Sequence, residues 1–372
     1  TDPVPTFTSL VGDPAGYELG RFRDVPTATM PAAVASELQK VLASAVDDGL
    51  PGVAATVMIA GNGKWSGAAG TADGVEPVTV ESQFGIGSIT KTVVAGQILR
   101  LAEEGAIVDL DDQVSAYLPP GLVFDTNDAT IRQLLSMRSG IPEADVVYGP
   151  SEPDPLRDWR PEELLAEVPP VRSEPGKYLQ YSGTNYILLG MVIEELTGLD
   201  LAHALRSGMT SDPGLTALVC QPGERPAGPY ALPFLGGKVR EDILVIGGGY
   251  LPSRSTASSG HGAGCMASDS GSVALWGYLL FGGNLLSESS LGMMTDTSDD
   301  GYGLGVFDLS NFGVDFDVDV VGNGGWDPGG YSATLVVLPS EGTVICVLTN
   351  KAGDPADLVL PVAAQLAAAV QS

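Results

Sequence analysis

Hydrophobic residues change their spacing along this chain, and each change predicts a different element. Across Pro31–Val46 the apolar residues recur every three to four positions, which predicts an amphipathic helix. The apolar stretch Val53–Ile59 and the segment Lys64–Gly70 are separated by a Gly-Asn-Gly turn, which predicts a β-hairpin. Another apolar run, Val93–Leu101, predicts a helix that begins near Ser88.

The middle of the chain has a different pattern. Between residues 107 and 230, Gly and Pro clusters separate short stretches of helical spacing, and convincing strands are scarce. Residues 230–262 are rich in Gly and Ser, which predicts a loop. The helices predicted for these parts and for the segment that follows are Asp128–Leu135, Pro161–Glu167, Tyr186–Leu196, Ser270–Leu280 and Leu291–Thr295.

Strand patterns dominate again near the end of the chain, before a closing helix. A helix and hairpin at the start, and strands and a helix at the end, predict one antiparallel sheet built from both ends. We therefore expect an α+β fold with an N-terminal arm (1–30), an α/β domain (31–106 and 231–372) and a mostly helical domain (107–230). The late elements are the strands Gly303–Leu309, Val314–Val321, Tyr331–Leu338 and Thr343–Leu348 and the helix Pro355–Val370.

The composition limits the classes of partner. The net charge of the 372 residues is −28, from 46 acidic and 18 basic side chains, which argues against nucleic acid and anionic lipid. No run of 18 apolar residues predicts a membrane span. The chain starts at Thr1 without Met, so removal of a signal peptide and an extracellular location are expected, while a cytoplasmic location stays open. We expect a monomer.

Residue types that bind metals are present, but not in binding patterns. The three cysteines are far apart and form no C-x-x-C pair, so the sequence predicts neither a zinc site nor a disulfide scaffold. Whether Cys220 and Cys265 are bridged stays open. The aspartates of Val314–Val321 alternate with apolar residues, as in a half-buried strand, and a calcium loop would need Gly where Val320 stands. No metal is expected.

Histidine is scarce, which limits the possible hydrolytic mechanisms. Only His203 and His261 are present, and no G-x-S-x-G elbow occurs, so a Ser-His-Asp mechanism has little support. His203 lies on a predicted helix and is expected to be structural. His261 lies in the predicted loop Ser258–Gly264, where contact with a ligand and no role at all are both open.

Ser88 and Lys91 form a candidate nucleophile and activator. Residues i and i+3 share one face of a helix, so both side chains would point the same way at its N-terminus. A serine hydroxyl needs a base to become a good nucleophile, and a lysine can act as one when burial or a nearby cation changes its protonation. The alternative is that Ser88 only caps the helix and Lys91 is solvated.

Two further stretches support the catalytic interpretation. Pro175–Tyr186 contains Tyr181-Ser182-Gly183, and Gly322–Tyr331 contains Asn323-Gly324-Gly325. Together with Ser88-x-x-Lys91, they resemble the three motifs of the serine penicillin-recognising enzymes. The most similar branch contains class C β-lactamases, D-alanyl-D-alanine carboxypeptidases, D-amino-acid amidases and esterases, and is peptidase family S12-like. Smaller similarities, which extend the resemblance over about residues 34–370, are Val108–Asp112, Leu134–Ile141 and Gly301–Gly305.

The resemblance implies a fold and a mechanism. It implies a β-lactamase/transpeptidase-like fold, with an antiparallel sheet flanked by helices, an all-helical domain and the site between them. Ser88 would be the nucleophile, Lys91 its base or electrostatic activator, and Tyr181 a second proton carrier. Whether Lys91 or Tyr181 takes the first proton stays open. The backbone N–H groups of Ser88 and Trp326 would form the oxyanion hole, and no cofactor would be needed.

Departures from the family pattern concern the substrate. The middle motif usually has Asn where this chain has Gly183, and Asn185 is expected to pack rather than to replace it. The last motif usually begins with Lys or His, which favours a substrate carboxylate, whereas here it begins with the neutral Asn323. Gly324 and Gly325 would let the substrate approach the strand. An amide, an ester or a substrate with a free amine therefore fits better than a β-lactam.

Three hypotheses follow for the function. The first is a serine hydrolase that cleaves a small-molecule or peptide amide or ester through a Ser88 acyl-enzyme. It would resemble a D-alanyl-D-alanine carboxypeptidase or D-amidase and have weak or no β-lactamase activity. The second is an acyltransferase or esterase of specialised metabolism on the same fold. The third is a non-catalytic binding protein, against which the intact Ser88, Lys91 and Tyr181 argue.

Overall fold

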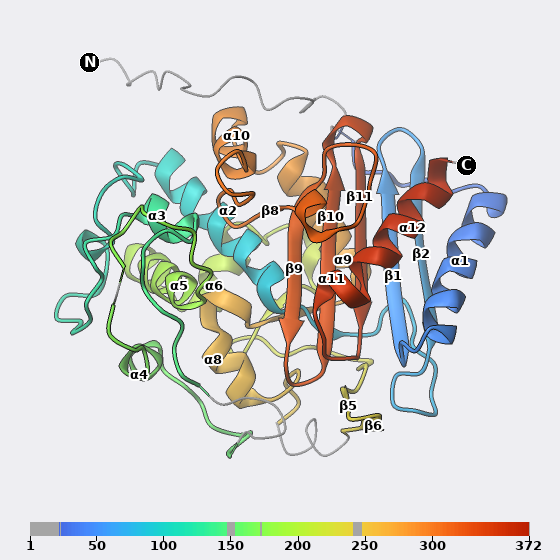
Figure 1. Ribbon diagram of the computed structural model, residues 1–372, viewed down its shortest axis with the longest axis horizontal. Helices are drawn as coiled ribbons and strands as arrows, with labels where there is room; N and C mark the ends of the chain where they lie inside the picture. The colour runs from blue at the N-terminus through green and yellow to red at the C-terminus, as the bar shows by residue number, and fades with distance from the viewer. Residues whose placement is uncertain (1–21, 23, 147–152, 172, 241–247, 372) are drawn as a thin grey trace.

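A six-stranded antiparallel sheet joins the two ends of the chain (Figure 1). A computed structural model describes residues 22, 24–146, 153–171, 173–240 and 248–371. Strand β1 pairs with β11, so that Val53 lies opposite Thr349. This pairing confirms the α+β fold with one sheet built from both ends. In spatial order, the strands are β2 (Gly63–Gly70), β1 (Gly52–Ile59), β11 (Thr343–Thr349), β10 (Tyr331–Leu338), β9 (Val321–Asp327) and β8 (Phe307–Asp308).

Both faces of this sheet are buried under helices, because its central strands are apolar on both sides. On β10, Leu335 packs with the face covered by helix α9 (Ser270–Phe281), while Val336 packs with the opposite face. Helices α1 (Ala32–Asp47) and α12 (Leu360–Gln371) cover that opposite face. The short helix α11 (Pro355–Leu358) precedes α12 and lies over β9 and β10.

The remaining helices form the other side of the molecule, with α2 (Thr90–Glu103) between them and the sheet (Figure 1). Helix α5 (Thr184–Thr197) is buried along most of its length and contacts α2 and α8. Around it lie helices α3 (Ile131–Leu135), α4 (Pro161–Ala166), α6 (Leu201–Ser207) and α8 (Arg254–Gly264), and helix α10 (Glu288–Thr295) lies near the other end of α2.

Two smaller sheets complete the fold. Strand β7 (Met266–Ser268) pairs with both β3 (Phe84–Gly85) and β4 (Val219–Cys220), and β3 leads directly into the segment that carries Ser88. Strands β5 (Phe234–Leu235) and β6 (Lys238–Val239) form a separate two-stranded sheet. Across the described residues, no helix combines the length and apolarity that a membrane span requires.

Several predicted elements are confirmed with shifted ends. The predicted hairpin corresponds to β1 and β2, and the predicted helix after Ser88 corresponds to α2. Helix α3 begins three residues later than predicted, because Thr130 caps it and Gln133 completes a capping box. The closing helix is interrupted at Val359, between α11 and α12. Most of the predicted arm, residues 1–21 and 23, lies outside the described residues.

Two strand predictions are wrong because local turns interrupt the extended backbone. Val314–Val320 is irregular: the backbone N–H of Asp317 donates to Asp315 Oδ1, and Asp317 has φ +59°. Short acidic side chains favour such turns over a strand. The strand predicted over Gly303–Leu309 shrinks to β8, because Gly305 turns the chain with φ +82°.

The loop predicted for residues 230–262 is also partly wrong. Helix α8 begins within it, and Ser253 caps its N-terminus by accepting a hydrogen bond from Thr256 N. The segment has few large apolar residues, so it lacks the periodicity that marks an amphipathic helix. It folds as a helix because it packs tightly against α5, where a Cβ at Gly262 would lie 2.2 Å from the Tyr186 carbonyl oxygen.

Candidate active site

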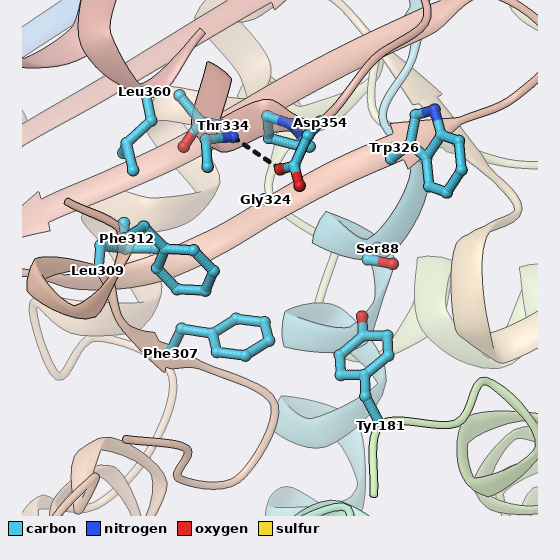
Figure 2. A pocket seen from close by; sticks show the side chains of 12 residues that line it. Ser88, Tyr181, Phe307, Leu309, Phe312, Gly324, Trp326, Thr334, Asp354 and Leu360 are labelled. Atoms are coloured by element: carbon cyan, nitrogen blue, oxygen red, sulfur yellow. Dashed lines mark hydrogen bonds between the residues drawn. The ribbon is translucent and has the colours of Figure 1, made fainter. Parts of the chain in front are cut away.

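Ser88 lies in a tight 3₁₀ turn, Gly87–Ile89, that leads into α2. Gly87 has φ +49°, and a Cβ there would lie 3.0 Å from the backbone nitrogen of Trp326, so the position favours glycine. Neither this turn nor α2 has a side-chain cap, so the interpretation of Ser88 as a mere capping residue is wrong. The Ser88 side chain is half-buried and faces a cavity (Figure 2).

Lys91 is buried beside Ser88. Its side chain is 2% exposed, and Nζ donates hydrogen bonds to Ser88 Oγ at 2.9 Å and to the carbonyl oxygen of Ala263 at 2.7 Å. Nζ also lies 5.0 Å from the centre of the Tyr181 ring and 5.7 Å from that of Tyr186, within cation–π range. The interpretation of Lys91 as a solvated side chain is therefore wrong.

Tyr181 lies opposite Ser88. Figure 2 shows its hydroxyl group pointing toward Ser88 from the far side of the cavity. The ring is 41% exposed and stacks on Phe307, with 5.7 Å between ring centres. Burial raises the pKa values of the neighbouring Tyr186 and Tyr302, so both phenols stay neutral in the ordinary pH range. Tyr181 is thus the exposed phenol of this cluster of three tyrosines.

Strand β9 forms the wall beside Ser88. A Cβ on Gly325 would lie 1.9 Å from the carbonyl oxygen of Ile86, so only glycine lets the strand approach the nucleophile turn. The backbone of Trp326 lies beside Gly87, next to Ser88. The oxyanion hole formed by the N–H groups of Ser88 and Trp326 stays a prediction. One such donor contributes roughly 3 kcal/mol to transition-state stabilisation.

Three predicted substrate-binding positions have different surroundings. Gly324 lines the cavity, whereas Asn323 is fully buried on the other face of β9 and donates to the carbonyl oxygen of Gly305 at 2.7 Å. Gly183 precedes α5, and its backbone N–H donates to Glu143 Oε2 at 2.6 Å. Asn185 is buried and hydrogen bonds to Ser139, so it packs the helix as expected.

Glu143 is a candidate site residue that the sequence analysis missed. It lies in an irregular segment outside every motif, and only its contact with Gly183, 40 positions later, places it near the site. A negative charge beside the Gly183 N–H was not expected there, because the family resemblance suggests an amide. No local sequence pattern marks such a long-range contact.

The cavity has a volume of about 290 Å³ and extends from Ser88 across Gly324 toward α11 and α12. Figure 2 shows Phe307 and Phe312 on one side and Asp354 near the other. Deep in the cavity is Thr334, which is buried and whose Oγ1 has no hydrogen-bond partner among the described residues. Most of the lining is apolar, contributed by Phe307, Leu309, Phe312, Trp326, Pro355 and Leu360.

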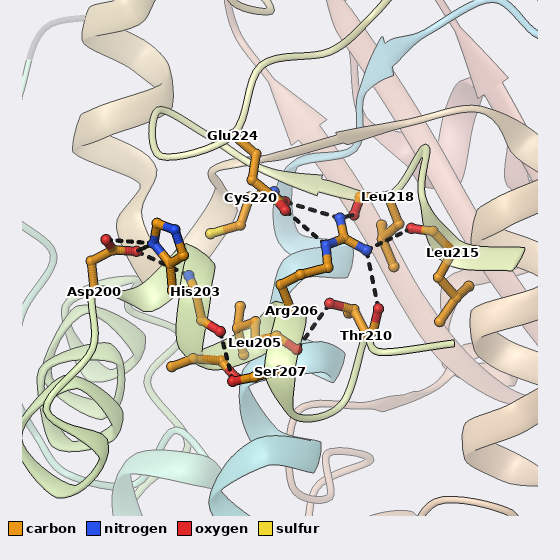
Figure 3. A network of polar contacts seen from close by, with 11 residues as sticks. Asp200, His203, Leu205, Arg206, Ser207, Thr210, Leu215, Leu218, Cys220 and Glu224 are labelled. Carbon is orange, nitrogen blue, oxygen red and sulfur yellow. Dashed lines mark hydrogen bonds and ion pairs between the residues drawn. The ribbon is translucent and has the colours of Figure 1, made fainter. Parts of the chain in front are cut away.

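The two histidines lie outside this cavity. His203 is exposed on α6 and contacts the carboxylate of Asp200, which supports a structural role (Figure 3). His261 lies near the end of α8, with Nε2 3.5 Å from Glu194 Oε2. The structure therefore places His261 in a helix–helix contact rather than in a ligand-binding loop. Within the described ranges, no group of three or more potential ligands is placed to hold a metal ion.

Comparison with known proteins identifies the family. The family model described as Beta-lactamase matches residues 33–369. The chain belongs to the β-lactamase family. The chain is 32% identical over 257 residues to "Esterase EstB" of Burkholderia gladioli, covering 62% of this chain and 61% of that protein.

Solved structures support the same relationship. A D-stereospecific amidohydrolase from Streptomyces sp. superposes with a TM-score of 0.71 and 30% identity, covering 87% of this chain and 97% of that one. The D-amino acid amidase from Ochrobactrum anthropi SV3 shares the fold, with a TM-score of 0.77 and 23% identity over 91% of this chain and 98% of that one. Two further relatives, "Beta-lactamase-like protein 2" of Dictyostelium discoideum and "Penicillin-binding protein 4" of Amycolatopsis lactamdurans, are matched over only 29% and 42% of their own lengths.

Proposed function

We propose that this β-lactamase-family protein is a serine hydrolase that cleaves an amide or ester through an acyl-enzyme on Ser88. The observation that carries the proposal is the 2.9 Å hydrogen bond between Ser88 Oγ and the buried Lys91 Nζ. In the described part of the chain, no carboxylate lies within ion-pair distance of Lys91, so its hydrogen bonds go to neutral oxygens. A nucleophile held by a buried activator is the arrangement that nucleophilic catalysis requires.

The proposed reaction has two halves. Ser88 Oγ bonds to the acyl carbon as its proton passes to Lys91 or Tyr181. The carbon–nitrogen or carbon–oxygen bond then breaks, and the leaving group takes up a proton from the same pair. A water molecule then attacks the acyl carbon and its proton passes to Lys91 or Tyr181. The bond between the acyl carbon and Ser88 Oγ breaks as Oγ takes up that proton, which releases the acid and restores Ser88. Backbone N–H groups of Ser88 and Trp326 would stabilise the negative charge on the carbonyl oxygen in both halves.

The electrostatics of the site favour a substrate without a free carboxylate. Asn323, where the family has a cation, is neutral and turned toward Gly305. The cavity wall carries the carboxylate of Asp354, and no Lys or Arg is among the described residues that line the cavity. A β-lactam carries a carboxylate, so we propose amide or ester hydrolysis with weak or no β-lactamase activity. The apolar lining supports a substrate with an apolar group.

The test is covalent labelling together with turnover. Intact-mass spectrometry after incubation with a fluorophosphonate should show one adduct, and peptide mapping should place it on Ser88. Turnover of p-nitrophenyl esters and amino-acid p-nitroanilides should disappear in Ser88→Ala. If the protein shows neither labelling of Ser88 nor Ser88-dependent turnover, the proposal is contradicted and the non-catalytic alternative remains. Persistent labelling of Ser88 by penicillin would instead favour a peptidase that binds carboxylate-bearing substrates.

A further inference from the structure

Glu143 places a carboxylate next to the catalytic residues. The point where a Cβ of Gly183 would lie is 3.0 Å and 3.3 Å from its two carboxylate oxygens. The same point is 3.2 Å from the Cβ of Ala263, whose carbonyl oxygen holds Lys91. Glu143 and Ala263 therefore both lie beside Gly183, and Ala263 in turn binds Lys91, which contacts Ser88.

The position of Glu143 is fixed by the residues around it. Its Oε2 accepts the Gly183 N–H, and the preceding carbonyl of Pro142 accepts a hydrogen bond from the Thr184 hydroxyl at 2.8 Å. Both donors belong to the start of α5, so the segment that carries Glu143 is attached to a buried helix. A carboxylate held in this way loses little conformational freedom when it binds a ligand.

The carboxylate is also available to a ligand. Glu143 is exposed, and none of the described cations forms an ion pair with it. Oε2 is used by Gly183 N, which leaves Oε1 for another donor. A Cβ at position 183 would lie 3.0 Å from Oε1 and 3.3 Å from Oε2, so any side chain there would crowd the carboxylate in its present position.

We propose that Glu143 binds a positively charged amino group on the acyl side of the substrate. An ammonium group provides up to three donors, and a charge-assisted hydrogen bond to a carboxylate is about twice as strong as a neutral one. This inference rests on the proposed function and narrows its substrate class to amino-acid amides or esters with a free amine. The uncharged amide of an N-acylated substrate would meet an unneutralised carboxylate instead.

Matched substrates test the proposal. For the native chain, kcat/KM should be at least tenfold higher for phenylalanine p-nitroanilide than for its N-acetyl derivative, with both enantiomers assayed. In Glu143→Gln, which can still accept the Gly183 hydrogen bond, the preference should fall at least tenfold. Asp145→Asn changes the net charge equally at an exposed carboxylate two residues away and should keep the preference. In the native chain, the preference for the free-amine substrate should decline as the pH rises through the pKa of its α-amine, about 8, because the amine loses its charge.

Two outcomes would overturn the proposal. One is an equal rate of hydrolysis of both substrates by the native chain. The other is an equal loss with both substrates in Glu143→Gln, which would indicate a structural role. Gly183→Ala is the second variant, since its Cβ would crowd both carboxylate oxygens while keeping the charge, and it should also reduce the preference. Fluorophosphonate carries no amine, so it should still label native Ser88 if only the role of Glu143 is wrong. If the proposed function itself is wrong, native Ser88 should not be labelled.

Discussion

The carbonyl oxygen of Ala263 accepts a hydrogen bond from Lys91 Nζ at 2.7 Å, although the two residues are 172 positions apart. Two residues before Ala263, His261 has φ 37° and ψ −131°, which bends the end of α8. Such a conformation costs a non-glycine residue of order 1–3 kcal/mol and persists only when surrounding contacts enforce it. The hydrogen bond between Lys91 and Ala263 places this bend at the candidate active site.

Gly190→Ala tests whether the bend at His261 supports Lys91. A Cβ on Gly190 would lie 2.5 Å from His261 Cε1, so the ring must move. We expect about a tenfold slower labelling of Ser88 at saturating fluorophosphonate, since 1.4 kcal/mol of lost transition-state stabilisation corresponds to a factor of about ten. Gly292→Ala is the control, because that Cβ meets no atom within 4 Å. Equal labelling rates in a folded Gly190→Ala chain would show that the bend is only structural.

Tyr181→Phe removes the exposed hydroxyl but keeps the aromatic ring. The stacking on Phe307 should remain, so the melting temperature should change little. If the hydroxyl transfers a proton, kcat should fall by about 10²- to 10⁴-fold, the usual contribution of general acid–base catalysis. Tyr178→Phe, which removes a hydroxyl from another exposed ring, is the matched control in steady-state assays. Unchanged kcat in Tyr181→Phe would assign proton transfer to Lys91 alone.

The adjacent glycines of β9 should respond differently to the same substitution. Gly325→Ala would place a methyl group 1.9 Å from the Ile86 carbonyl oxygen and force β9 away from the nucleophile turn. We expect a loss of roughly 1–3 kcal/mol in unfolding free energy, as for other overpacked sites, and little labelling of Ser88.

Gly324→Ala directs its methyl group toward Pro355, 3.1 Å away, at the cavity wall. This variant should stay close to native stability but hydrolyse substrates with bulky apolar groups more slowly than small ones. Chemical denaturation and a series of esters with increasing acyl size would separate the two effects. Equal behaviour of the two variants would contradict the placement of Gly324 at the cavity and Gly325 at the turn.

Arg206 should be important for stability although it lies away from the cavity. Its guanidinium pairs with Glu224 and donates to the carbonyl oxygens of Thr210, Leu215 and Leu218 (Figure 3). Because hydrogen bonds to charged groups contribute about 1.5–3 kcal/mol each, Arg206→Met should lower the unfolding free energy by at least about 2 kcal/mol. Urea denaturation would measure the change. Arg100→Met, which removes an exposed pair with Glu104, should cost less than about 1 kcal/mol.

The cysteines should react slowly in the folded protein. Sγ of Cys220 lies 3.4 Å from Sγ of Cys265, and this contact together with burial raises the pKa of the Cys220 thiol. Burial also raises the pKa of Cys346. Since the thiolate is the reactive form, native alkylation with iodoacetamide at pH 8 should be slow and should accelerate on unfolding. Mass spectrometry should then find three alkylated cysteines, whereas one would show that Cys220 and Cys265 form a disulfide.

Strands with regular patterns were predicted well, and segments ruled by local turns or by tertiary contact were not. Strands β10 and β11 are buried on both faces, so each is a mostly apolar run in the sequence. The ends of these runs therefore predict the ends of the strands. Apolar and acidic residues alternate in Val314–Val320 as in a strand, yet the Asp315 side chain accepts a hydrogen bond from Asp317 N and forms a turn instead. Helix α8 has almost no periodic apolar face, and its packing on α5 decides its structure.

The sequence by itself determined that Ser88 and Lys91 lie side by side. Ser88 and Lys91 are three residues apart at the start of a helix, and helical geometry alone brings them to one face. The motifs of Tyr181 and of Gly324 and Gly325 also follow from local sequence, since each lies next to a helix or strand of clear pattern.

Only the tertiary structure decided what surrounds this pair. Three hydrogen bonds join segments that are distant in sequence: Lys91 to the carbonyl oxygen of Ala263, Asn323 to that of Gly305, and Gly183 N to Glu143. Such contacts depend on how whole helices and strands pack, so no spacing of residues along the chain encodes them locally. The pairing of Ser88 with Lys91 was therefore predictable from local sequence, whereas the features that we propose select the substrate required the fold.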